Sequence, residues 1–317
     1  MPEEKSIIVK TKESLVEAIQ GTGDVTKALL DLVSGTLVAA LKGTKSVGSE
    51  AASLVKDTIV GSVRGIAEVG EEVSSAAKGI IIGVVTGTKE VAENTLETIG
   101  KSVSTLIHTT SEVGGDLATT AKGAMEGTIV AAKELGVSVT DAITHASTSI
   151  IKGTKEVGSE LATTAKETVI GAAQAAKEVG EKAMETISHT AGAVVKATAE
   201  VGGDVGSTVK GSMIGALEGA KKVGEQAMDT ISGTASSMIK ATSQVGGDLA
   251  STAKNAVEGA IEGAKGIGVD TAEAASTAAT SAIKAAGNIS ASAGKQVRDA
   301  VTGTIGGVKV VIKEPFK

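Results

Sequence analysis

Aliphatic residues recur along the chain at intervals of 22 residues, in one register from about Gly21 to the C-terminus. When the stretches that begin at Gly43, Gly65 and every twenty-second residue thereafter are stacked, the fifth residue of each is aliphatic. These twelve residues are Val47, Val69, Val91, Val113, Leu135, Val157, Val179, Val201, Val223, Val245, Ile267 and Ile289. The sixth residue is glycine in ten of the twelve stretches. A register without insertions predicts a periodic architecture in which each repeat occupies an equivalent environment.

The spacing of apolar positions within a repeat predicts α-helix. Each repeat has six apolar steps in 22 residues, about 3.67 residues per step, which is close to the 3.6 residues of an α-helical turn. No repeat keeps the period of two that a strand requires over more than a few residues. We therefore predict an all-α protein of tandem 22-residue amphipathic helical repeats, arranged either as long helices or as stacked helical hairpins.

The pattern divides the chain into an N-terminal segment (1–20), the repeat array (21–306) and a C-terminal segment (307–317). Residues 7–10 (IIVK) and 308–313 (VKVVIK) are short β-branched runs. They predict either short strands at the two termini or frayed ends.

Two kinds of repeat alternate in the second half of the array. Lysine ends every other repeat, at Lys152, Lys196, Lys240 and Lys284. The repeats between them carry the related strings ELATTAK (160–166), DVGSTVK (204–210) and DLASTAK (248–254). Two unlike helices in each double repeat suit an antiparallel hairpin, and they suit a long helix equally well.

Charged residues also follow the repeat. Lysines occupy the third and fourteenth positions, as in Lys155 and Lys166, and acids occupy the fourth and eighth, as in Glu156 and Glu160. One interpretation is that parallel helices lie side by side with unlike charges adjacent. The other is that these are solvated faces with pairs inside each helix.

Three interpretations of the 41 glycines stay open. Runs of small residues allow helices to pack closely, as in Gly79, Gly83 and Gly87 or in Gly211, Gly215 and Gly219. Val-Gly-Gly-Asp strings at 113–116, 201–204 and 245–248 predict turns in which aspartate caps the next helix. Finally, glycine costs about 1 kcal/mol relative to alanine inside a helix, so the helix could form only on a surface or partner.

Composition narrows the classes of function. Phe316 is the one aromatic residue and cysteine is absent, so any core is thin and no disulfide forms. The net charge is −6 without a basic tract, which excludes nucleic acid as an expected partner.

The longest apolar run, Gly79 to Val85, is shorter than the roughly 18 residues of a membrane-spanning helix. The N-terminus also lacks the order of a secretory signal. We expect a cytoplasmic protein, soluble or peripherally bound to a membrane or lipid body.

No constellation of residues predicts an enzyme. The three histidines are His108, His145 and His189, and no second group of ligands accompanies them. Serines and threonines are abundant but lack the context of a nucleophile, and the Gly-x-x-Gly strings lack that of a phosphate loop. We predict no catalytic, cofactor-binding or metal-binding residues and no cofactor.

The motifs KTKE (10–13) and GTKEV (87–91 and 153–157) resemble those of α-synuclein and of the repeat arrays of the perilipin family. That resemblance implies a helix that forms on a lipid surface, without catalytic residues. Residues 171–186 (GAAQAAKEVGEKAMET) are similar to the 11-residue motif of group 3 late embryogenesis abundant proteins, which implies protection during desiccation.

Three functions follow from the sequence. The first is a coat on a lipid surface or other apolar body, bound through the twelve fifth-position residues as an apolar stripe. The second is a self-associating structural protein, as a helical bundle, filament or spacer rod. The third is a desiccation or stress protectant.

Overall fold

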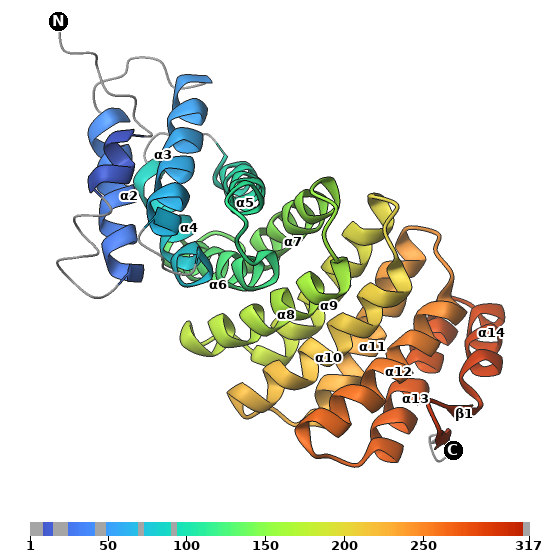
Figure 1. The fold of residues 1–317 in the computed structure, drawn as a ribbon. Helices are drawn as coiled ribbons and strands as arrows, with labels where there is room; N and C mark the ends of the chain where they lie inside the picture. Colours follow the sequence, from blue (N-terminus) through green and yellow to red (C-terminus); the bar gives the residue numbers. More distant parts are fainter. Residues whose placement is uncertain (1–8, 15–24, 42–48, 69–72, 90–93, 313–317) are drawn as a thin grey trace, which may run out of the picture. The chain divides into compact units, whose positions relative to one another are not determined.

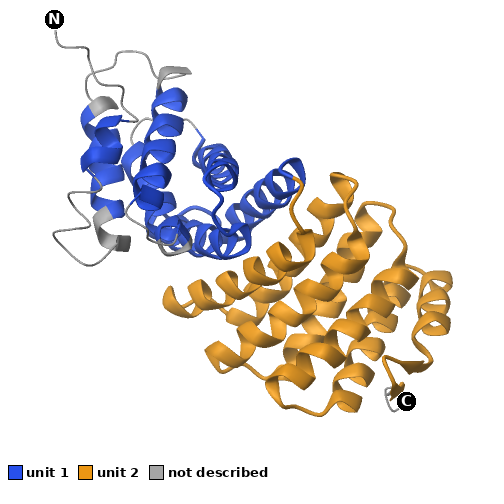
Figure 2. Ribbon diagram, viewed as in Figure 1, with its two compact units in different colours: residues 1–157 blue, residues 158–317 orange. Residues whose placement is uncertain are grey.

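The computed structural model describes residues 9–14, 25–41, 49–68, 73–89 and 94–312. The chain is all-α and forms two compact units, residues 1–157 and 158–317 (Figures 1 and 2). The first unit contains α2 (Val25–Leu41), α3 (Ser49–Glu68), α4 (Val73–Thr88), α5 (Thr95–Glu112), α6 (Leu117–Leu135) and α7 (Val139–Glu156). The second contains α8 (Leu161–Glu178), α9 (Ala183–Glu200), α10 (Val205–Val223), α11 (Ala227–Gln244), α12 (Leu249–Ile267), α13 (Thr271–Ile289), α14 (Ala291–Val301), β1 (Gly303–Ile305) and β2 (Val308–Val310).

Stacked helical hairpins, one of the two predicted arrangements, are confirmed. In the second unit the even-numbered helices pack in the order α8, α10, α12, and the odd-numbered helices pack in the order α9, α11, α13. Each hairpin of one even and one odd helix therefore adds one double repeat to a two-layered stack (Figure 1). The alternative of long continuous helices is wrong, because the chain turns back after each helix.

Glycine at the sixth repeat position ends the helices. Eight consecutive glycines at this position, from Gly114 to Gly268, have φ between 65° and 85°. Residues with a side chain rarely adopt this left-handed backbone conformation, whereas glycine does so readily. The conformation lets the chain leave the helix while the last carbonyl groups of the helix keep their hydrogen bonds. After α9, for example, Gly203 N–H donates to Thr198 O at 2.8 Å. The prediction of turns at the three Val-Gly-Gly-Asp strings is confirmed, and the same turn occurs at the other five of these glycines.

Aspartate at the eighth position begins the next helix. The carboxylates of Asp116, Asp204, Asp248 and Asp270 each accept hydrogen bonds from backbone N–H groups in the first turn. These groups have no partner within the helix, so the side chain satisfies them. The predicted capping by the aspartates of the Val-Gly-Gly-Asp strings is therefore confirmed for Asp116, Asp204 and Asp248.

Glycines inside the helices bring neighbouring backbones together, so the close-packing interpretation is also confirmed. A Cβ on Gly83 of α4 would lie 2.9 Å from Val33 Cβ in α2. In the second unit, Gly219 of α10 lies in the same way against Ala173 of α8, at 2.8 Å. Side chains at these positions would force the helices apart.

The core between the layers is built from small aliphatic side chains. Val169, Met213 and Ile239 are fully buried in the second unit, whereas the buried members that α13 adds to the large apolar cluster are alanines, with Ile283 partly buried against them. Buried threonines occupy many remaining positions, and several of their hydroxyls donate to carbonyls one turn earlier, as Thr198 Oγ1 does to Val194 O at 2.9 Å. Such bonds let a polar side chain be buried at low cost. The hydroxyls of Thr208 and Thr234 are buried without a hydrogen-bond partner among the described residues.

A short helix and a β-hairpin cover the C-terminal side of the stack. Helix α14 packs on α13 and α12, and β2 packs on α13 (Figure 1). The strand β2 pairs with β1 in antiparallel register, Thr304 opposite Lys309, and Val311 N–H donates to Ser276 Oγ at 3.1 Å. The predicted C-terminal strand is thus confirmed over Val308–Val310. At the other terminus Val9 and Lys10 are helical, which contradicts the predicted strand there, and residues 7 and 8 lie outside the described ranges.

Candidate interaction surfaces

The fifth-position residues do not line one helix. Val113, Val157, Val179, Val201 and Val245 are helix C-caps. Leu135, Val223, Ile267 and Ile289 are each the last residue of a helix. All nine line the turns and are half-buried except Ile289, which is exposed. Because successive helices are antiparallel, the six residues of the second unit form two rows at opposite ends of its hairpins. The remaining three, Val47, Val69 and Val91, lie outside the described residues.

The predicted continuous apolar stripe is therefore corrected in its geometry. Helical wheels place the fifth position beside the other apolar positions only if the helix continues through it, and each helix ends there. The apolar side chains on the helices themselves, such as Ile187 and Val209, are buried between layers.

Interhelical ion pairs cross the outer surface of the even helices in the second unit. Lys166 Nζ of α8 lies 2.8 Å from Glu218 Oε1 of α10, and Lys210 Nζ of α10 lies 2.7 Å from Glu262 Oε2 of α12. The hydrogen bond to Glu262 raises the pKa of Lys210, because it stabilises the charged ammonium. The interpretation that unlike charges meet between parallel helices is confirmed here. The carboxylates come from the twenty-second repeat position, however, and not from the fourth or eighth.

The outer surface of the odd helices in the second unit carries two rows of charge, and we call it the odd face. Glu185, Asp229 and Glu273 form an acidic row in the first turns of α9, α11 and α13. Lys196, Lys240 and Lys284 form a basic row nearer the C-terminal ends of the same helices. Fully buried side chains such as Ile187 and Ile231 face the opposite way.

Small polar residues separate the two rows and join the three helices. Ser281 Oγ of α13 donates to Ser232 Oγ of α11 at 2.8 Å. Between α11 and α9, a Cβ on Gly192 would lie 2.6 Å from Ser237 Oγ. Ser281 and Ser232 are 49 residues apart in the chain, and Gly192 and Ser237 are 45 apart. Equivalent repeat positions are 44 apart, so neighbouring odd helices are displaced along their axes by only one to five residues. Each row of charge therefore runs across the three helices.

Ion pairs differ along the basic row. Lys196 has Glu200 one turn later at 3.9 Å, whereas Gln244 and Asn288 occupy the corresponding positions after Lys240 and Lys284. Among the described residues, Lys240 and Lys284 have no ion pair. Two cationic side chains of the odd face are thus available to a partner.

The odd helices of the first unit carry related pairs. Arg64 of α3 contacts Glu112 of α5 at 3.5 Å, and His108 of α5 contacts Glu156 of α7 at 2.9 Å. Basic residues recur at every second repeat, at positions 64, 108, 152, 196, 240 and 284. The regular spacing of the lysines in this series was identified from the sequence, but Arg64 and His108 were not identified as members of the same series.

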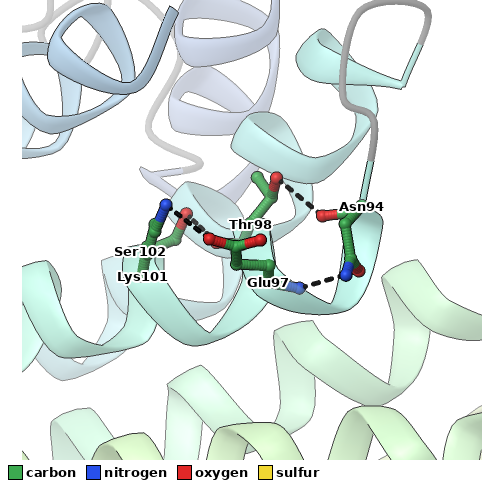
Figure 3. A network of polar contacts seen from close by, with 5 residues as sticks. All are labelled: Asn94, Glu97, Thr98, Lys101 and Ser102. Atoms are coloured by element: carbon green, nitrogen blue, oxygen red, sulfur yellow. Dashed lines mark hydrogen bonds and ion pairs between the residues drawn. The ribbon is translucent and has the colours of Figure 1, made fainter. Parts of the chain in front are cut away.

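The start of α5 shows how polar residues organise a helix end (Figure 3). Asn94 Oδ1 accepts from Glu97 N–H at 3.2 Å, and Thr98 Oγ1 donates to Asn94 O at 3.1 Å. The carboxylate of Glu97 meets Lys101 Nζ at 2.6 Å, which lowers the Glu97 pKa. These contacts are local and stabilise the helix end.

No three His, Asp or Glu side chains of the described ranges are grouped as metal ligands. None of the described helices combines the length and apolarity needed to cross a bilayer. Neither the comparison with protein-family models nor that with curated proteins finds a match for the chain.

Proposed function

We propose that the chain is a non-enzymatic structural protein, an α-solenoid in which the number of hairpins sets the length of a stack that presents extended polar surfaces. The observation that carries the proposal is the use of the apolar side chains. In the described residues they pack between helices, and the large apolar side chains left exposed are Val9, Ile289 and Val311. Repeat proteins of this kind act through such continuous surfaces, because each repeat contacts only its neighbours.

The repeated contacts support a mechanical role. In the second unit the ion pair between Lys166 and Glu218 recurs one hairpin later as Lys210 and Glu262. Equivalent joints between successive hairpins favour a stack of regular geometry, as a spacer or scaffold requires.

Coating a lipid surface is a second candidate. It requires the hairpins to open and turn the same side chains outward, as the resemblance to the perilipin and α-synuclein repeats implies. One observation favours it: the fully buried apolar residues of α13 are alanines, with Ile283 partly buried beside them, so opening this helix exposes little apolar area. The stress-protection role and the resemblance to desiccation proteins stay predictions.

Far-UV circular dichroism in buffer, repeated with neutral and anionic lipid vesicles, separates the two candidates. The structural role predicts strong helicity and a thermal transition in buffer, with no gain on adding vesicles. A coil in buffer that becomes helical and floats with vesicles would overturn it in favour of the coat. Val209→Asp places a charge in the core of the second unit and is the control, because it should lower the helical signal of that unit in buffer.

A further inference from the structure

We infer that the odd face of the second unit binds the odd face of a second copy of this chain, with the helices of the two copies antiparallel. This inference rests on the proposed function, because it requires the solenoid to be folded in water. It concerns α9, α11 and α13 and the two charged rows that cross them.

The arrangement of charge selects one way for two copies to meet. The two rows are separated by half a repeat on each helix, or about 16 Å at a rise of about 1.5 Å per residue. A two-fold axis along the stacking direction reverses the helices and places the acidic row of one copy against the basic row of the other. A two-fold axis along the helices places like charges together, which costs free energy. The odd face is therefore complementary to itself in one isologous arrangement.

The residues between the rows permit close approach. On α9, His189 and Ala193 lie between the two rows, and His189 holds the repeat position of Gly233 and Thr277. On α11 and α13 the middle of the face is formed by Gly233, Ser237, Thr277 and Thr280. These side chains are short and half-buried, so the long charged side chains at the two edges can span the gap to the partner.

The size of the odd face suits a dimer. Three helices of 18 or 19 residues are each about 27 Å long, and packed helices lie about 9 Å apart. The face therefore covers roughly 700 Å² on each copy, or about 1,400 Å² in a dimer, within the range of specific interfaces.

The even helices provide the contrast. Their lysines and glutamates are already joined across the helices, as in Lys210 and Glu262. On the odd face, Lys240 and Lys284 have no ion pair among the described residues, so binding a second copy breaks none at these lysines. We expect the dimer to weaken as the ionic strength rises, because exposed charges are screened by salt.

The test uses two variants of the full chain with opposite faces. K240E/K284E makes both rows acidic across α11 and α13, and D229K/E273K makes both rows basic there. Sedimentation velocity at low salt should show a dimer for the unmodified chain. Each variant alone should dissociate at least about tenfold more readily, since like charges then meet.

An equimolar mixture of the two variants should restore the dimer, because an acidic face then meets a basic one. The control K254E/K265E reverses lysines on α12 in the even layer and should leave dimerisation unchanged. A helical chain that stays monomeric at high concentration and low salt would overturn the inference. The inference would also be overturned if the mixture of the two variants did not associate, or if the charge reversals did not weaken the dimer. Absence of helix in buffer would instead show that the proposed function fails.

Discussion

Gly215 of α10 lies directly against the main-chain oxygen of Lys166 in α8, and a Cβ on the glycine would overlap that oxygen. The relationship recurs one hairpin later, where a Cβ on Gly259 would lie 2.8 Å from Lys210 O. It also occurs in the first unit, between Gly127 and Lys78 O. The two backbones meet with no side chain between them, which explains why glycine is used inside helices despite its cost.

Gly215→Ala should therefore destabilise the second unit. We expect the free energy of unfolding to fall by about 1–3 kcal/mol, because the methyl group forces two packed helices apart. Urea unfolding followed by circular dichroism measures the change. Gly266→Ala on α12 is the matched control, since its Cβ would have no atom within 4 Å. That substitution should stabilise by up to about 1 kcal/mol. Equal effects of the two variants would contradict this account of the glycines.

The cap of α10 should make its stability depend on pH. Hydrogen bonds from the Ser207 hydroxyl and backbone N–H lower the pKa of Asp204. A depressed folded-state pKa means that the contribution is present above the unfolded-state value and is lost as the pH falls through the folded-state value. Asp204→Ala should cost about 1 kcal/mol at pH 7, and less and less as the pH falls below about 4.

Glu160 gives the control for this prediction. It precedes α8 without accepting a backbone hydrogen bond, so Glu160→Ala should change the stability less at pH 7. Unfolding curves at pH 7 and pH 3 provide the comparison. A cost of Asp204→Ala that does not change with pH would show that the carboxylate is not the cap.

The solenoid should tolerate the loss of a whole hairpin but not of half of one. Deleting residues 205–248 removes α10 and α11 and leaves Asp204 to cap α12 in an even position. We expect a folded protein that is shorter by one hairpin in small-angle scattering. Deleting residues 205–226 removes α10 alone and moves α11 into the even layer, where its buried and exposed positions no longer match. We expect lower helicity or aggregation, and equal tolerance of both deletions would contradict the hairpin as the structural unit.

The sequence predicted much of the fold, and it did so for local reasons. Glycine at a fixed position, followed by Asp204 or Asp248 two residues later, predicts a turn because both residue types have specific backbone roles there. The fifth-position valines were misplaced because one helix together with its turn has the length of the repeat. Twenty-two residues also correspond to about six turns of an uninterrupted helix, so the apolar spacing alone does not show that each helix ends within the repeat.

The candidate surfaces could not be derived in the same way. The partner of Lys210 is Glu262, which lies on the next even helix and beyond the whole of α11 in the chain. A pairing of this kind depends on which helices become neighbours. The self-complementary rows of the odd face likewise require α9, α11 and α13 to stand side by side in register.

The sequence by itself determined the helical character of the repeats and the turn and cap residues of the Val-Gly-Gly-Asp strings, because propensity, capping and turn conformation act over a few residues. Only the tertiary structure decided that the helices stack in two layers, that the apolar positions face one another, and which charges pair or stay free. Those outcomes follow from the close packing of distant helices, which the spacing of residues along one helix does not specify.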